Sequence, residues 1–126
     1  MTENEIASVV VDAAFKIHNA LGPGLFESVY DATLEFELKK RGLRIDHQVG
    51  FPVHYEGVKL SLGFRPDLVI ENKVIVEVKS IEALAPVHKK QLLTYLRLLD
   101  LRLGLLINFN VDLIKNGIQR VVNNLV

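Results

Sequence analysis

The stretch "RPDLVIENKVIVEVKS", residues 65–80, constrains the fold of this chain more than any other segment. It contains two short apolar runs with the two-residue alternation of β-strands, and the turn-forming residues 71–73 lie between them. A turn at that place makes the two runs an antiparallel hairpin in which Ile70 pairs with Val74. Because successive side chains of a strand point to opposite faces, one face of the hairpin is wholly apolar and is expected to pack in the core.

The other face of the hairpin carries Asp67, Glu77 and Lys79. With this three-residue turn Asp67 lies directly across from Glu77, with Cβ atoms about 5 Å apart, whereas a two-residue turn would stagger the two acids. Two carboxylates at that distance cannot both stay ionised without a cation or a shared proton. Lys79 can offset one charge, and Mg²⁺, which favours one or two carboxylates with waters and substrate phosphates, would offset both. A partly exposed sheet edge with solvated charges and one Glu–Lys contact explains the same pattern, so the pattern alone leaves both interpretations open.

Outside the hairpin, helical and strand periods alternate along the chain. Amphipathic helices are expected over residues 3–21, 26–41 and 85–101, the first with a capping box of Thr2 and Glu5 and the second with Gly42 just past its end. Strands are expected over residues 44–55, 58–70, 73–80 and 102–109, with a turn at Glu56-Gly57 and a final strand after Asn116-Gly117. The order is two helices, three strands, a helix and a strand followed by a tail, which predicts an α/β fold.

The composition narrows the class of protein. A chain of 126 residues that is 49% hydrophobic and 24% charged is typical of one globular domain, expected over residues 1–126. The chain has no cysteine, which excludes disulfides and thiolate zinc sites. No basic leader precedes an apolar run, and no apolar stretch approaches bilayer length, so we expect a cytoplasmic protein without a membrane partner. Because the net charge is zero, any nucleic-acid contact must come from a local basic patch.

Two groups of residues give the chain a family resemblance. "RPD" on one strand, "EVK" on the next strand and a helix after it resemble the PD-(D/E)XK nuclease superfamily. "GLFESVY" at residues 24–30 resembles the pattern that names the GxxExxY protein family, through Gly24, Glu27 and Tyr30. Residues 86–109 are similar to that family's helix and following strand. The resemblance implies a restriction-endonuclease-like core, with the order α-β-β-β-α-β and a mixed central sheet flanked by helices.

The resemblance also implies roles for individual residues. Asp67 and Glu77 match the superfamily's metal-binding acids, and Lys79 matches its catalytic lysine. Gln91 matches a polar residue on the helix after the lysine strand, and Glu27 matches an acid that some members contribute to the metal from the helix before the sheet. The implied cofactor is Mg²⁺ or Mn²⁺, and the implied reaction is phosphodiester hydrolysis in nucleic acid, with DNA favoured over RNA.

Four further residues are candidates for contacting substrate or supporting the acids: Tyr30, Arg65, His88 and Tyr95. Arg65 shares a strand face with Asp67, so it can contact a phosphate or pair with an acid. His88 lies in the first turn of its helix, where a surface or capping role is the alternative. For both tyrosines, packing in the core is at least as good an explanation.

Three functions remain open at this point. The first is a metal-dependent nuclease, and the second is a catalytically silent module of the same fold that binds nucleic acid or a partner protein. The third is a metal-dependent hydrolase of small phosphorylated molecules, which the neutral net charge keeps open. The high apolar content and the valine-rich ends also suggest a homodimer.

Overall fold

A computed structural model describes residues 1–125, and Val126, the last residue of the expected domain, lies outside the described residues. The three expected helices are present as α1 (Glu3–Leu21), α2 (Glu27–Lys40) and α3 (Pro86–Leu99). The capping box of α1 is confirmed, because the amide of Glu5 donates to Thr2 Oγ1 at 3.2 Å and the amide of Thr2 donates to Glu5 Oε1 at 2.9 Å.

The central sheet has five strands in the order β1-β4-β5-β6-β7. They are β1 (Ile45–His47), β4 (Leu68–Ile70), β5 (Val74–Lys79), β6 (Leu103–Asn108) and β7 (Ile118–Val122), and a short 3₁₀ turn η1 (Ile114–Gly117) precedes the last. β5 and β6 pair in parallel, joined by α3, whereas the other neighbours pair antiparallel. This mixed sheet flanked by helices is consistent with the α/β, restriction-endonuclease-like core expected from the sequence.

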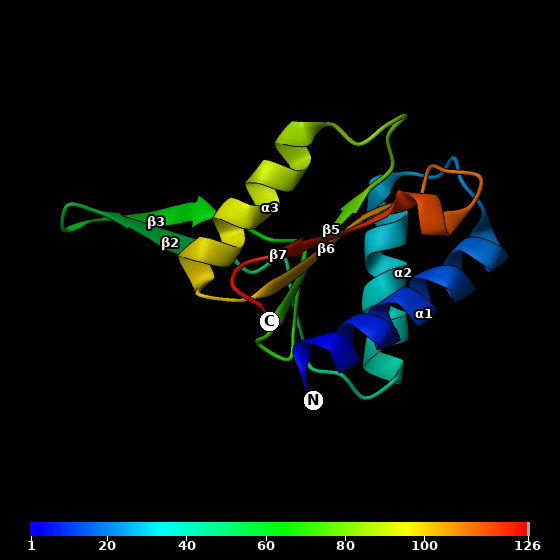
Figure 1. Ribbon diagram of the computed structural model, residues 1–126, viewed down its shortest axis with the longest axis horizontal. Helices are drawn as coiled ribbons and strands as arrows, with labels where there is room; N and C mark the ends of the chain where they lie inside the picture. The colour runs from blue at the N-terminus through cyan, green and yellow to red at the C-terminus, as the bar shows by residue number, and fades with distance from the viewer. Residues whose placement is uncertain (126) are drawn as a thin grey trace.

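The expected strands over residues 44–55 and 58–70 were wrong in one respect, because each is divided between two sheets. The parts of these segments on either side of the Glu56-Gly57 turn, β2 (Phe51–Tyr55) and β3 (Val58–Phe64), form a separate two-stranded sheet. This sheet projects from the body as an arm (Figure 1). The chain therefore has two more strands before α3 than expected. The alternating pattern continues through both breaks, so the apolar period does not show which sheet a residue joins.

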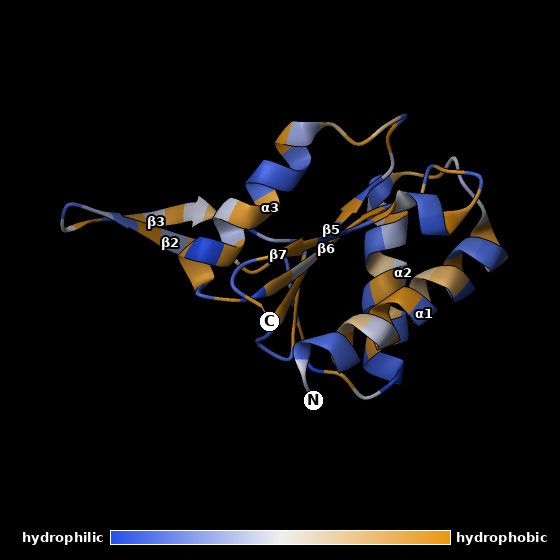
Figure 2. Ribbon diagram, viewed as in Figure 1, coloured by the Kyte–Doolittle hydropathy of each residue, from blue (hydrophilic) through white to orange (hydrophobic). Residues whose placement is uncertain are grey.

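Helices cover both faces of the central sheet, and the strand residues alternate between them (Figures 1 and 2). Val74, Val76 and Val78 of β5 pack in the core beneath α1 and α2. Ile75 points to the other face, where it packs with Leu92 of α3. Glu77 and Lys79 have the same parity as Ile75, so they lie on the α3 side of the sheet.

The hairpin formed by β4 and β5 has the register expected from the sequence. Ile70 pairs with Val74, and Leu68 pairs with Val76. The turn is closed by a 2.9 Å hydrogen bond from the amide of Lys73 to the carbonyl of Ile70. Continuing this register by one residue brings Asp67 opposite Glu77, at the end of the hairpin remote from the turn.

Candidate active site

Asp67 and Glu77 hold each other in place across the hairpin. The amide of Val78 donates to Asp67 Oδ2 at 2.8 Å, and the amide of Asp67 donates to Glu77 Oε2 at 3.2 Å. Glu77 is only 5% exposed. The two carboxyl groups are therefore fixed by backbone donors rather than by solvent, which keeps them together in a partly dry environment.

The acid pair cannot carry two negative charges. Burial, followed by the side-chain hydrogen bond and the charge of Asp67, raises the pKa of Glu77 to about 9, and the backbone amide of Asp67 and the charge of Lys79 only partly oppose this. Glu77 is therefore protonated at neutral pH when no cation is bound. Buried Glu77 and partly exposed Asp67 supply carboxylate oxygens that need a positive charge, and these fit a hard divalent cation such as Mg²⁺ or Mn²⁺, which would replace the proton.

Glu27 lies near this pair without completing a three-ligand cluster. Within residues 1–125 no group of three histidine, aspartate or glutamate side chains is placed to hold a metal ion. Burial raises the pKa of Glu27, while Lys79 lowers it and Asp67 raises it again. Glu27 thus lies within electrostatic range of both residues.

A short loop before α2 sets the position of Glu27. Gly24 in this loop has φ +98°, a left-handed conformation that favours glycine. Tyr30 is fully buried, and its hydroxyl accepts a hydrogen bond from the amide of Leu25 at 3.2 Å. Ser80 Oγ donates to the carbonyl of Leu25 at 2.6 Å, which ties the loop to the residue after Lys79. The glycine and tyrosine of the "GLFESVY" motif are therefore structural residues that hold the start of α2 against the end of β5.

Asn108 fixes the chain where it leaves β5. It pairs with Lys79 in the β5–β6 ladder and is 1% exposed. The Ile81 amide donates to Asn108 Oδ1 at 3.1 Å, and Asn108 Nδ2 donates to the Ile81 carbonyl at 2.9 Å. Sequence reasoning missed this residue, although one amide at the end of an otherwise apolar strand was a usable signal.

Two of the predicted site residues, Gln91 and Tyr95, lie on helix α3. The ring centroid of Tyr95 lies 4.8 Å from that of Phe64, at the base of the arm. The pKa of Tyr95 is raised by burial and then by the negative charges of Glu77 and Asp67, so its hydroxyl lies within electrostatic range of both carboxyl groups. Gln91 is exposed one helical turn earlier and therefore on the same face of α3.

The other two candidates have different surroundings. His88 accepts a hydrogen bond from the amide of Ala85 at 2.9 Å, so it caps the start of α3. Arg65 is exposed two residues before Asp67, and none of the ion pairs found in the described part of the chain includes it. A substrate phosphate can therefore reach its guanidinium group.

Sequence reasoning also missed Asp31, which follows Glu27 by one helical turn. It is 4% exposed, and its Oδ2 atom is hydrogen-bonded by His47 and Gln48 from the end of β1. The spacing of Asp31 from Glu27 is visible in the sequence, but its burial and its two partners are not. Asp31 is therefore a third acid, besides Glu77 and Glu27, within electrostatic range of Asp67. Burial raises the pKa of Asp31 most, and the negative charge of Asp67 also raises it.

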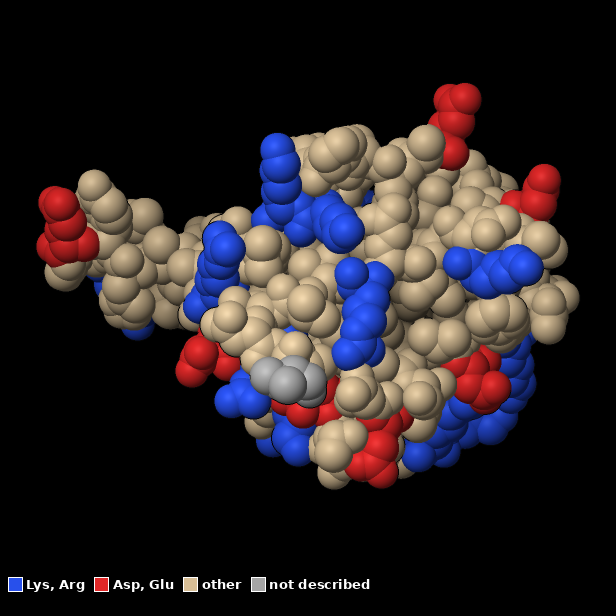
Figure 3. Space-filling view, in the orientation of Figure 1, with Lys and Arg blue, Asp and Glu red and all other residues tan. Residues whose placement is uncertain are grey.

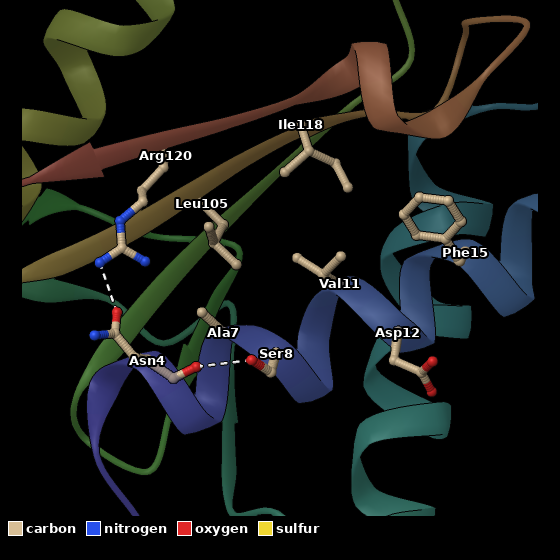
Figure 4. A pocket seen from close by; sticks show the side chains of 9 residues that line it. All are labelled: Asn4, Ala7, Ser8, Val11, Asp12, Phe15, Leu105, Ile118 and Arg120. Carbon is tan, nitrogen blue, oxygen red and sulfur yellow. Dashed lines mark hydrogen bonds between the residues drawn. The ribbon is translucent and has the colours of Figure 1, made fainter.

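A pocket of about 660 Å³ lies away from these residues, between α1 and the β6–β7 edge of the sheet (Figure 4). Its walls include Val11, Phe15 and Ile118, and Arg120 closes one end by donating to Asn4 Oδ1 at 2.6 Å. This pocket is on the α1 side of the sheet, whereas the acids face the α3 side. It shares no residue with the candidate site.

The fold and the acid pair define an α/β protein of nuclease type, and comparison with known families agrees. Residues 4–121 match the family model described as the PD-(D/E)XK nuclease superfamily. The match covers nearly the whole chain, so the chain belongs to this superfamily, which supports a nuclease-like function and is typically associated with divalent metals. No curated protein and no solved structure matched the chain. None of the helices within residues 1–125 is long and apolar enough to cross a membrane.

Proposed function

We propose that this protein is a metal-dependent nuclease of the GxxExxY family, a single domain that hydrolyses phosphodiester bonds in DNA more readily than in RNA. The observation that carries the proposal is the hydrogen-bonded pair of Asp67 and buried Glu77, which needs a positive charge and has Lys79 on the same strand face. Mg²⁺ or Mn²⁺ bound there would supply an activated water and neutralise charge on the phosphate.

Each residue of the site has a role in this proposal. Asp67 and Glu77 would hold the metal ion, and Glu27 at the start of α2 would reach it through a water molecule. Lys79 stabilises the negative charge that develops on the phosphate in the transition state. Gln91 orients the attacking water. Tyr95 and Arg65 flank the acids, and His88 keeps the first turn of α3 in place beside them.

Two surface features favour nucleic acid over a small phosphorylated molecule. Lys89 and Lys90 of α3 line a groove between α3 and β7, and lysine and arginine side chains gather over this part of the molecule (Figure 3). They supply a local basic patch on a chain with no net charge. Phe26, immediately before Glu27, is 82% exposed and offers an aromatic face on which a base can stack.

The arm offers a surface for the homodimer that we also propose. Its exposed side chains include Tyr55, Val58, Leu60 and Leu62, with Leu62 72% exposed. A contiguous apolar surface of this kind is typical of a protein–protein contact. Light scattering on protein eluting from a size-exclusion column measures the molar mass and so tests the dimer. A monomer mass at micromolar concentration would contradict the proposed dimer.

The catalytic proposal is tested by incubating the protein with single-stranded, duplex and branched DNA and with RNA, in Mg²⁺ or Mn²⁺. Cleavage should be abolished by chelation and should fall at least a hundredfold in Asp67→Ala and Lys79→Ala. Asp12→Asn on α1 is the matched control and should cleave normally. Cleavage that survives Asp67→Ala would reject the assigned site. Nucleic-acid binding without metal-dependent cleavage would instead favour the catalytically silent module.

A further inference from the structure

Asp31 is the best-connected buried acid near the candidate site. Its Oδ2 atom is 2.9 Å from Gln48 Nε2 and is also hydrogen-bonded to His47 Nε2. Its Oδ1 atom is buried and has no hydrogen-bond partner among the described residues. A buried carboxylate without such donors would be costly, so these two bonds account for its retention at this position.

Gln48 connects Asp31 to the backbone of Asp67. The amide of Gln48 donates to the carbonyl of Asp67 at 2.8 Å, while its side-chain amide donates to Asp31. Gln48 also has φ +51°, a left-handed conformation that a residue other than glycine adopts only at some cost. Such a conformation persists where surrounding contacts determine it, and the two hydrogen bonds of Gln48 supply those contacts.

His47 reinforces the same junction. Its Nδ1 atom lies 3.4 Å from Glu35 Oε1, while Nε2 faces Asp31, so both ring nitrogens are directed at carboxylates of α2. In β1, His47 pairs with Leu68, the residue after Asp67. The end of β1 thus forms a bridge between α2 and the first residues of β4.

We propose that Asp31 is a positioning residue that, through Gln48, fixes the backbone of Asp67 relative to the helix that carries Glu27. The inference rests on the proposed function, because it concerns the distance between two acids of the same site. Glu27 and Asp67 come from different elements, and no hydrogen bond joins them directly within residues 1–125. An error of about 1 Å in such a distance can cost about a hundredfold in rate.

The decisive variant is Gln48→Gly. It removes the side-chain bond to Asp31 but relieves the left-handed backbone, so the variant should fold as well as the original protein. Asn72→Gly is the matched control, because Asn72 has φ +53° in the β4–β5 turn at the opposite end of the hairpin. Asp31→Ala removes the acceptor, and Asp31→Asn keeps an acceptor oxygen and should recover part of the loss.

We expect Gln48→Gly to lower kcat about tenfold and to raise the half-saturating Mn²⁺ concentration about tenfold, with KM for DNA changed less than twofold. Asp31→Ala should change kcat and the Mn²⁺ requirement in the same direction. Because both substitutions remove the hydrogen bond between Gln48 and Asp31, the double variant should be no less active than either single variant. If Gln48→Gly behaves like Asn72→Gly, the positioning role is rejected.

Amide hydrogen exchange separates this inference from the proposed function. In the original protein the Gln48 amide should be protected, and in Asp31→Ala it should exchange at least tenfold faster, with the Lys73 amide as the unchanged reference. If the protein neither binds Mn²⁺ nor cleaves DNA, the proposed function fails, and with it the role of Asp31 in positioning a catalytic acid. Unchanged exchange at Gln48 in an active protein would reject the connection alone.

Discussion

The hydroxyl of Tyr30 lies 2.5 Å from the carbonyl oxygen of Gly22, to which it donates a hydrogen bond. The ring of Tyr30 stacks on that of Phe109, with centroids 4.6 Å apart and planes inclined by 4°. These contacts hold the loop that precedes Glu27.

Tyr30→Phe should therefore destabilise the protein while leaving the ring stack intact. The carbonyl of Gly22 would lose its donor, so the free energy of unfolding should fall by about 1–2 kcal/mol in urea titrations. Tyr55, which is 67% exposed, provides the control Tyr55→Phe, expected to change stability by less than about 0.5 kcal/mol. Equal effects of the two substitutions would show that the loop does not depend on this bond.

The raised pKa of Glu77 predicts how stability depends on pH in the absence of metal. Between the ordinary value of 4.5 and about 9, the folded protein keeps a proton that the unfolded chain releases. The stabilisation is therefore fully present below pH 4.5 and is lost as pH rises towards 9, by up to about 1.4 kcal/mol per pH unit. Urea unfolding in a chelator from pH 5 to pH 9 measures this slope. Glu77→Gln should flatten it, and an unchanged slope would contradict the assignment.

Metal binding should release the proton held by Glu77. Calorimetry in buffers of different ionisation enthalpy should show release approaching one proton at pH 7, and Mn²⁺ affinity should rise with pH until about 9. At a hundred times its dissociation constant, the metal should stabilise the protein by about 2.7 kcal/mol. Asp67→Ala should abolish this stabilisation. Binding without proton release would argue against a metal ion at the acid pair.

Phe26 should contribute to nucleic-acid affinity through base stacking. Phe26→Ala is expected to weaken binding of single-stranded DNA in Ca²⁺ by about tenfold, which corresponds to the lower part of the range for one stacked base. Phe26→Trp should retain affinity. The matched control is Phe36→Ala, within α2, 64% exposed and more than two helical turns beyond Phe26. Equal affinity of the two alanine variants in fluorescence anisotropy would exclude stacking at Phe26.

The arm should be joined to the body mainly through Phe64. This residue is 8% exposed and packs on Phe51 and Tyr95, with ring centroids 5.7 and 4.8 Å away. Phe64→Ala should cost about 3–5 kcal/mol of unfolding free energy, whereas Leu62→Ser, further out on the arm, should cost less than about 0.5 kcal/mol. Comparable losses measured by thermal and urea unfolding would mean that the outer arm is part of the core.

Features set by neighbouring residues could be predicted from the sequence. The capping box of Thr2 and Glu5 spans three residues, and its geometry follows from the helix itself. The register that pairs Ile70 with Val74 follows from a short turn and from alternation on two adjacent strands. The proximity of Asp67 and Glu77 is a consequence of that register.

Features that depend on contacts between residues far apart in the chain could not be predicted from the sequence. Gln48 ends β1 because its left-handed backbone is held by Asp31 and Asp67, each well separated from it along the chain. Neither the alternation of residues 44–55 nor that of residues 58–70 contains this information, so the division of each segment between sheet and arm was not predicted. Asn108 is visible in the sequence as the amide that ends apolar β6, but its hydrogen bonds to Ile81, just after β5, are not.

The sequence by itself determined that two acids and a lysine share one face of a hairpin, because turn length and strand parity are local properties. Only the tertiary structure decided what surrounds them. The loop before Glu27 reaches the end of β5 through Ser80, and α2 reaches Asp67 through Gln48. Those contacts join residues far apart in the chain, where the entropy lost in closing the loops is repaid only when the whole core packs.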